Sequence, residues 1–204
     1  MRATLKYSTG EKAIIFYAAL FLLFLYIPVL LLPLFSFSES QYMQFPITDW
    51  TLERYATMWK KKKLQDALFA SIKVGVFASV ASTIIGTLAA RAVTKYKFPL
   101  KTSVLGFIML PMVFPEIIMG VGLLIFATTV GMNLSLVTVT IGHVLICLPF
   151  AVVVIISRLE GFDRGLEEAS LDLGENAWNT FRRITFPIIW SGILASLLLT
   201  FTIS

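Results

Sequence analysis

Long apolar runs separated by short polar segments dominate the sequence. The runs cover residues 13–35, 67–90, 103–130 and 134–156, and a last one covers 187–204. Because about 20 apolar residues in a helix cross the hydrocarbon core of a bilayer, each run is close to the length of a membrane span. The pattern predicts an all-α polytopic membrane protein, a single domain over residues 1–204 with five transmembrane helices.

The first run predicts a retained transmembrane helix. Its length of roughly 23 residues exceeds the 7–15 residues of a signal-peptide core. Pro28 and Pro33 fall in its second half, where missing N–H groups are expected to bend the helix. The second run has a different signature: Gly75, Ser79, Ser82, Gly86 and Ala90 recur every three or four residues. Such a stripe lets another helix approach closely, so we expect it to be a packing face.

Composition agrees with a membrane protein and excludes several kinds of site. Hydrophobic residues make up 57% of the chain and charged residues only 14%, whereas soluble domains average about 25% charged. One cysteine, Cys147, and one histidine, His143, exclude a disulfide framework and a paired-histidine metal site. No glycine precedes a lysine, so the phosphate-binding P-loop is absent. We therefore expect no catalytic residues, metal or cofactor, and ATP hydrolysis would need a partner.

Most basic residues lie on one side of the predicted membrane. They are Arg2, Lys6 and Lys12, the acid-free group Arg91, Lys95, Lys97 and Lys101, and Arg158, Arg164, Arg182 and Arg183. Because cytoplasmic loops are enriched in Lys and Arg, this distribution predicts a cytoplasmic N-terminus and explains the net charge of +5 without nucleic acid. The four lysines at 60–63 fall on the opposite side and remain unexplained.

The polar loop 158–186 between the last two runs has the features of a docking segment. Leu166, Ala169, Ser170 and Leu173 share one face of a short helix predicted to begin near Asp163, flanked by Glu167, Glu168 and Asp172. Gly174 suits a left-handed residue at the helix end, Asn176 suits the N-cap of a second helix, and Pro187 suits the first turn of the next.

The spacing within this loop also resembles a known motif. Glu168, Ala169, Ser170, Gly174, Ile184, Phe186 and Pro187 match the E-A-A-x3-G-x9-I-x-L-P loop of inner-membrane permeases of binding-protein-dependent ABC importers. Ser170 replaces the second alanine of the motif and Phe186 replaces its leucine. The stretches P-E-I-I-M-G and G-H-V-L-I-C-L-P-F further resemble the permeases of spermidine/putrescine importers.

This resemblance implies half of a translocation pore in a bacterial inner membrane. The partners would be a second homologous permease, an ATPase dimer that binds ATP, an extracytoplasmic solute-binding protein and a polyamine substrate. The residues implied to dock the ATPase are Leu166, Glu168, Ala169, Ser170, Asp172, Leu173, Gly174 and Pro187. Since such permeases usually have six helices, the chain is expected to stop inside its fifth.

Two polar residues lie within predicted helices and are candidates for the substrate path. Glu116 follows Pro115 in the third run, roughly 20 Å along a helix that starts near Ser103. A carboxylate within a membrane is costly and indicates function, although it could instead satisfy backbone donors freed by the prolines. His143 in the fourth run could line the path or simply bind a neighbouring helix through a hydrogen bond.

Three other functions are compatible with parts of this pattern. The chain could be a permease of the same importer family for another small solute, or a secondary transporter or channel that works without ATP and uses Glu116 as an ion site. It could also be a structural membrane subunit without a path of its own. The docking loop argues against the ATP-independent transporter.

Overall fold

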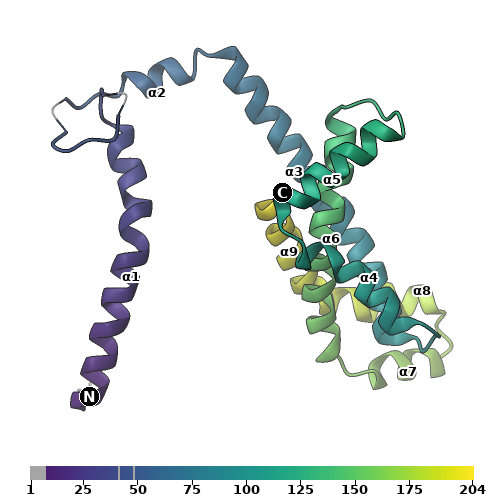
Figure 1. Ribbon diagram of the computed structural model, residues 1–204. Helices are drawn as coiled ribbons and strands as arrows, with labels where there is room; N and C mark the ends of the chain where they lie inside the picture. The colour runs from purple at the N-terminus through teal and green to yellow at the C-terminus, as the bar shows by residue number, and fades with distance from the viewer. Residues whose placement is uncertain (1–7, 41, 48) are drawn as a thin grey trace. The chain divides into compact units, whose positions relative to one another are not determined.

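The computed structural model describes residues 8–40, 42–47 and 49–204, which form helices joined by short loops (Figure 1). The chain divides into two compact units, Met1–Gln65 and Asp66–Ser204. Arg2 and Lys6, which contributed to the predicted orientation, lie outside the described residues.

The N-terminal unit is built around helix α1, Thr9–Ser36, which confirms the first predicted span. The Ser8 side chain accepts a hydrogen bond from the Glu11 backbone N–H, and the Glu11 carboxylate accepts one from the Ser8 N–H. This capping box satisfies both backbone N–H groups at the start of the helix. The backbone stays helical through Pro28 and Pro33.

A folded loop follows α1 and leads into the short helix α2, Glu53–Met58. Ser38 and Trp50 form an isolated antiparallel bridge, and the Arg54 guanidinium donates to the carbonyls of Glu39 and Ser40 at 2.7 and 2.6 Å. The sequence pattern of this segment gave no sign of this fold-back.

Helix α3, Lys62–Lys95, extends beyond the predicted span 67–90 at both ends. Its last turns contain Arg91 and Lys95, which were predicted to lie in a loop. They are helical because the chain has no Gly or Pro between Gly86 and Pro99 to end the helix earlier.

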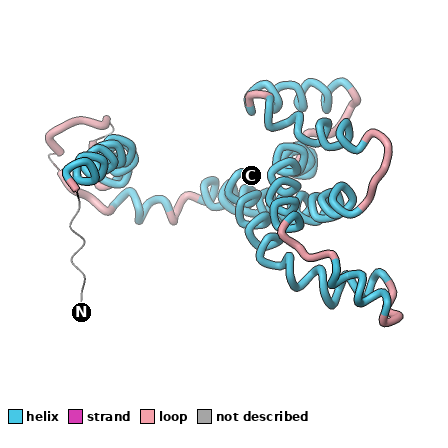
Figure 2. Tube along the Cα trace, turned by 90° about the horizontal axis from the view of Figure 1, so that it is seen from below, coloured by secondary structure: helices cyan, strands magenta, loops and turns pink. Residues whose placement is uncertain are grey.

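Helices α3, α6 (Leu136–Glu160) and α9 (Phe186–Ile203) pack together in the second unit. Figure 2 draws the helices in cyan and the loops that join them in pink. The predicted stripe of small residues is buried and supplies the contacts of α3. A Cβ at Gly86 would lie 2.7 Å from the Cβ of Ala151 on α6, and one at Gly75 would lie 3.1 Å from Phe201 on α9. Thr83 and Ser196 add a hydrogen bond of 3.2 Å between α3 and α9.

The third predicted helix, 103–130, is in fact two helices. These are α4, Lys101–Val113, and α5, Glu116–Thr129, with an angle of 107° between them. Pro115 has no N–H to donate, and it disfavours helical backbone at the residue before it. Phe114 accordingly has extended geometry, φ −84° and ψ 141°. The straight-helix estimate of the depth of Glu116 was therefore wrong.

The docking loop forms α7, Gly165–Asp172, and α8, Ala177–Thr180. A π-helical segment, Phe181–Thr185, joins α8 directly to α9. The fifth apolar helix therefore begins ten residues before the predicted start at Pro187, and Ala177–Ile203 counts as one candidate span of 27 residues. Figure 1 shows α7 and α8 at one end of the second unit and α5 at the other.

Four of the described helices are long and apolar enough to span a membrane, and the bent pair α4 and α5 would make a fifth. This agrees with the prediction of an all-α membrane protein with five spans, provided that the bent pair crosses the bilayer once.

Candidate functional site

The carboxylate of Glu167 joins three elements at the end of the second unit that carries α7. Its Oε2 accepts a hydrogen bond from Lys95 Nζ of α3 at 2.5 Å, and its Oε1 lies 3.5 Å from Arg91 Nη2, also of α3. The hydroxyl of Thr185, in the π-helical segment, donates to Oε1. Glu167 is 9% exposed. We refer to Glu167, Arg91, Lys95 and Thr185 as the Glu167 cluster.

Glu167 is ionised within this cluster at neutral pH. Burial raises the pKa of its carboxyl group, but hydrogen bonds from Lys95 and Thr185 and the positive charges of Lys95 and Arg91 together lower it below the ordinary 4.5. The charge and the contacts that depend on it persist down to pH 4.5, and they are lost only as the pH falls through the lowered pKa.

Three further contacts hold the loop in place. Ser170 on α7 and Thr180 on α8 share a hydrogen bond of 3.0 Å between buried hydroxyls. Arg164, just before α7, donates to the Thr94 carbonyl of α3 at 2.7 Å. The Arg91 guanidinium also lies 4.3 Å from the ring centroid of Phe181, a cation–π arrangement.

The remaining side chains of α7 form an exposed face. Leu166 is 46% exposed and Leu173, just after the helix, is 86% exposed. We define the docking face as these two leucines with the exposed residues Glu168, Ala169 and Asp172. Ser170 was predicted to lie on this face, but its hydroxyl is directed at Thr180 instead.

Glu167 was predicted on the flank of α7, and the structure buries it. The contact of Glu167 could have been sought from the acid-free basic group that contains Arg91 and Lys95, because the sequence predicts this group on the same side of the membrane as the loop. Periodicity alone, however, does not show which of two adjacent glutamates meets that segment, because the direction of the helix face depends on how the loop folds back.

The turn after α7 confirms the local predictions. Gly174 has a φ of +86°, which is strained for any residue with a side chain. The Asn176 side chain accepts from the Asn179 N–H at 2.9 Å and caps α8. Pro187 lies in the first turn of α9 and is exposed.

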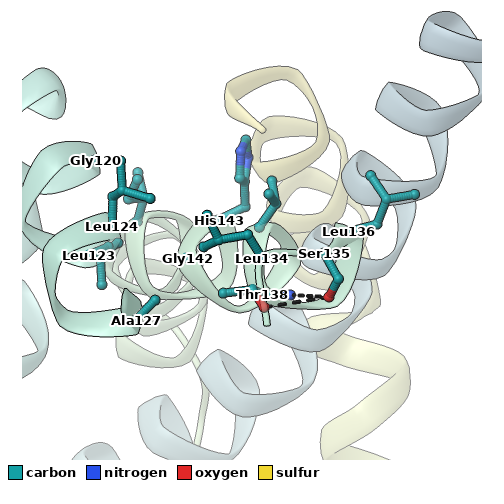
Figure 3. Close-up of a pocket in the computed structure, with 12 residues that line it drawn as sticks. Gly120, Leu123, Leu124, Ala127, Leu134, Ser135, Leu136, Thr138, Gly142 and His143 are labelled. Atoms are coloured by element: carbon teal, nitrogen blue, oxygen red, sulfur yellow. Dashed lines mark hydrogen bonds between the residues drawn. The ribbon is translucent and has the colours of Figure 1, made fainter. Parts of the chain in front are cut away.

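An open cavity of about 520 Å³ lies between α5 and α6, away from the docking face. Figure 3 shows side chains of both helices around it, with Ser135 and Thr138 joined by hydrogen bonds. The lining residues are Gly120, Leu123, Leu124, Ala127, Leu134, Ser135, Leu136, Thr138, Val139, Gly142, His143 and Ile146. The lining is therefore mostly apolar, with a few hydroxyls and one imidazole.

Of the two predicted path residues, His143 lines this cavity and Glu116 lies near it. Glu116 is the exposed first residue of α5, one helical turn before Gly120, which lines the cavity. Glu116 itself is not among the residues that line the cavity. His143 Nδ1 lies 2.9 Å from the Ser204 hydroxyl, the inter-helix contact considered as the alternative to a path role.

Within the described ranges, no group of three or more His, Cys, Asp and Glu side chains could hold a metal ion.

Comparison with known proteins identifies the family. Residues 82–204 match binding-protein-dependent transport system inner membrane components. This chain belongs to that family. The matched segment contains the Glu167 cluster, the docking face and the cavity, so all three features belong to the family's own domain.

Named members of this transport family include polyamine permeases. The chain is 35% identical over 182 residues to the spermidine/putrescine transport system permease protein PotC of Haemophilus influenzae, covering 89% of this chain and 70% of that protein. It is 32% identical over 188 residues to the putrescine transport system permease protein PotI of Escherichia coli, covering 89% and 66%. A probable molybdenum ABC transporter permease of Haloferax volcanii is 30% identical over 139 residues, covering 64% and 52%.

Proposed function

We propose that this chain is a permease subunit of an ATP-driven importer that carries a polyamine across the inner membrane. It would form half of the pore with a second, homologous permease. An ATPase dimer would bind and hydrolyse the ATP, so the chain itself needs no catalytic group or cofactor. An extracytoplasmic binding protein would deliver the substrate, and the N-terminus of the chain would lie in the cytoplasm.

The division of α7 into a fixed face and an exposed face carries the docking part of this proposal. One side of the helix is held by Glu167 and Ser170, while the other presents Leu166 and Leu173 to solvent. A leucine that is 86% exposed at the tip of a well-anchored loop suits insertion into a groove on a partner. The spacing from Glu168 to Pro187 matches the loop through which related permeases engage their ATPases.

The polyamine part rests on the relatives and on the chemistry around α5. A polyamine alternates ammonium groups with methylene chains. The apolar cavity between α5 and α6 suits the methylenes, and the Glu116 carboxylate, one helical turn before the lining residue Gly120, suits an ammonium group that has partly left water. The break before α5 resembles the discontinuous helices that form solute sites in other transporters.

In this mechanism the ATPase dimer moves α7. Closure of the dimer on ATP would displace the docking face, and the helices attached to it would switch the pore from inward-facing to outward-facing. Hydrolysis would reset the pore. The role of the chain is therefore to convert a displacement at one end of its helices into a change of access along them.

Leu173→Asp tests the docking face. Removal of the exposed leucine and addition of a charge should reduce co-purification of the ATPase subunit about tenfold or more, because a central apolar contact contributes about 1–3 kcal/mol. Leu100→Asp is the matched control. Leu100 is 74% exposed at the α3–α4 connection and has a φ of 63°, a conformation that Asp tolerates well.

Normal ATPase recovery with Leu173→Asp would contradict the docking role. Equal losses with Leu173→Asp and Leu100→Asp would mean that added charge harms the complex wherever it is placed, and the docking face would then have no special role.

A further inference from the structure

We propose that Glu167 is a positioning residue for energy coupling: it locks α7 to the inner end of α3, so that a displacement of the docking face moves α3 instead of being absorbed by the loop. This inference rests on the proposed function. The docking face would receive the displacement from the ATPase, and the Glu167 cluster would pass it on to α3.

The geometry of the cluster makes Glu167 the point where the loop is joined to the helices. Lys95 and Arg91 both belong to α3, and Thr185 belongs to the π-helical segment that leads into α9. One carboxylate therefore bridges α7 to two long helices. Ser170, by contrast, ties α7 only to α8, which is part of the same loop.

The charge of Glu167 is needed to hold this joint. The side chains of Glu167 and Arg91 are 11% and 17% exposed, so neither charge is well solvated. Breaking a buried pair by removing one partner leaves the other charge uncompensated, which is costly. Within the described part of the chain, Arg91 Nη1 is already buried without a hydrogen-bond partner. Loss of the carboxylate would leave Arg91 and Lys95 facing each other, and the hydrogen bond from Arg164 to the Thr94 carbonyl would be left to hold the start of α7 to α3.

The attachment of α3 to the rest of the unit makes it able to pass on the movement. The same helix packs on α6 at Gly86, only five residues before Arg91 along the chain. It also bonds to α9 through Thr83 and Ser196. Protein interiors are close-packed and transmit strain, so a displacement of α3 at Lys95 would also displace its contacts with α6 and α9.

Glu167→Gln is the direct test, made in the assembled importer with its ATPase and binding protein. Glutamine keeps the shape and can still bond to Thr185, but it removes the charge. The expected result is normal recovery of the ATPase subunit and continued ATP hydrolysis, with polyamine uptake per ATP hydrolysed reduced about tenfold, within the usual range of coupling energies. Glu160→Gln, an exposed carboxylate at the end of α6, is the matched control and should behave as the unmodified protein.

A covalent replacement of the ion pair supplies a second test. Lys95→Cys and Glu167→Cys are combined with Cys147→Ser, and the two new thiols are joined by a short bismaleimide in the purified, reconstituted importer. Uptake per ATP should be low before the reaction and rise several-fold after it. A merely structural role would not be rescued in this way, since the cross-link restores neither the charge nor the hydrogen bonds.

Several outcomes would overturn the inference. An unchanged uptake-to-ATP ratio in Glu167→Gln would show that α3 is not driven through this carboxylate. Loss of the ATPase subunit in Glu167→Gln, with no recovery of coupling in the cross-linked protein, would show that Glu167 only shapes the docking face. If Leu173→Asp retains the ATPase while Glu167→Gln uncouples uptake, the proposed docking face fails and the coupling role of Glu167 stands.

Discussion

At the scale of single residues, the proposed polyamine substrate depends most on Glu116. It begins α5 directly after the Pro115 break, where the partial positive charge of a helix N-terminus favours a carboxylate. The side chain is exposed, so its charge is available to a group from outside the chain.

Glu116→Gln should reduce spermidine uptake about tenfold or more while leaving binding-protein-stimulated ATP hydrolysis intact. The substitution keeps the shape and removes the charge that offsets desolvation of an ammonium group. Uptake of radiolabelled spermidine into proteoliposomes measures the effect, and Glu116→Asp should be intermediate. Glu39→Gln, which removes an exposed carboxylate from the loop after α1, serves as control.

Two results would change the assignment. Failure of Glu116→Gln to assemble would make the carboxylate structural. Assembly with a normal uptake rate would favour a neutral or anionic solute.

The same scale shows what the sequence could predict about the site. Gly174 and Asn176 were identified correctly because their roles depend on backbone conformation within a few residues. Glu167 and Ser170 were misplaced because their partners, Lys95 and Thr180, depend on how α7 folds against other elements. Local periodicity contains no information about that direction.

At the scale of elements, α3 and α6 approach each other closely at Gly86. Gly86 and Ala151 meet there with no space for a second methyl group, since a Cβ on Gly86 would lie 2.7 Å from that of Ala151. The predicted stripe of small residues thus has a defined partner on α6.

Gly86→Ala should destabilise the permease by about 1–3 kcal/mol, the usual effect of overpacking. Thermal unfolding of the purified complex in detergent measures this. The double variant Gly86→Ala with Ala151→Gly moves the methyl group across the interface and should recover most of the loss. Equal stability of Gly86→Ala and the unmodified protein would show that the helices can separate at this point without cost.

The helices were predicted well where hydropathy determines their position, and less well where a proline determines where a helix bends or begins. Apart from the break at Phe114 and Pro115, the five apolar runs form helices, as expected of apolar segments whose backbone must be satisfied in a bilayer. The 107° bend between α4 and α5 at Pro115 was not predicted. Pro187 lies in the first turn of α9, as expected, but the π-helical segment before it makes Ala177–Ile203 one continuous candidate span.

At the scale of the whole molecule, the orientation in the membrane decides which end meets the ATPase. The basic residues favour a cytoplasmic docking face. The lysines at 60–63 are exposed around the start of α3 and do not fit this rule. The structure gives no account of them.

Cysteine labelling tests the orientation on a background with Cys147→Ser. Leu173→Cys, 86% exposed on the docking face, should react with an impermeant thiol reagent only after the membrane is opened. Gln44→Cys, exposed in the loop after α1, should react in intact spheroplasts. The opposite pattern would place the docking face outside and overturn both the topology and the coupling mechanism.

The helical segment from Ala177 to Ile203 connects the docking loop to α9 without a break. It packs closely against α6 at Gly192, where a Cβ would lie 3.0 Å from the Arg158 side chain. At 1.5 Å per residue, roughly 23 Å of helix separates Ala177 from this contact. Further along the chain, the Ser204 hydroxyl lies 2.9 Å from His143 Nδ1 in the wall of the cavity. One continuous helical segment therefore leads from the docking loop to the cavity.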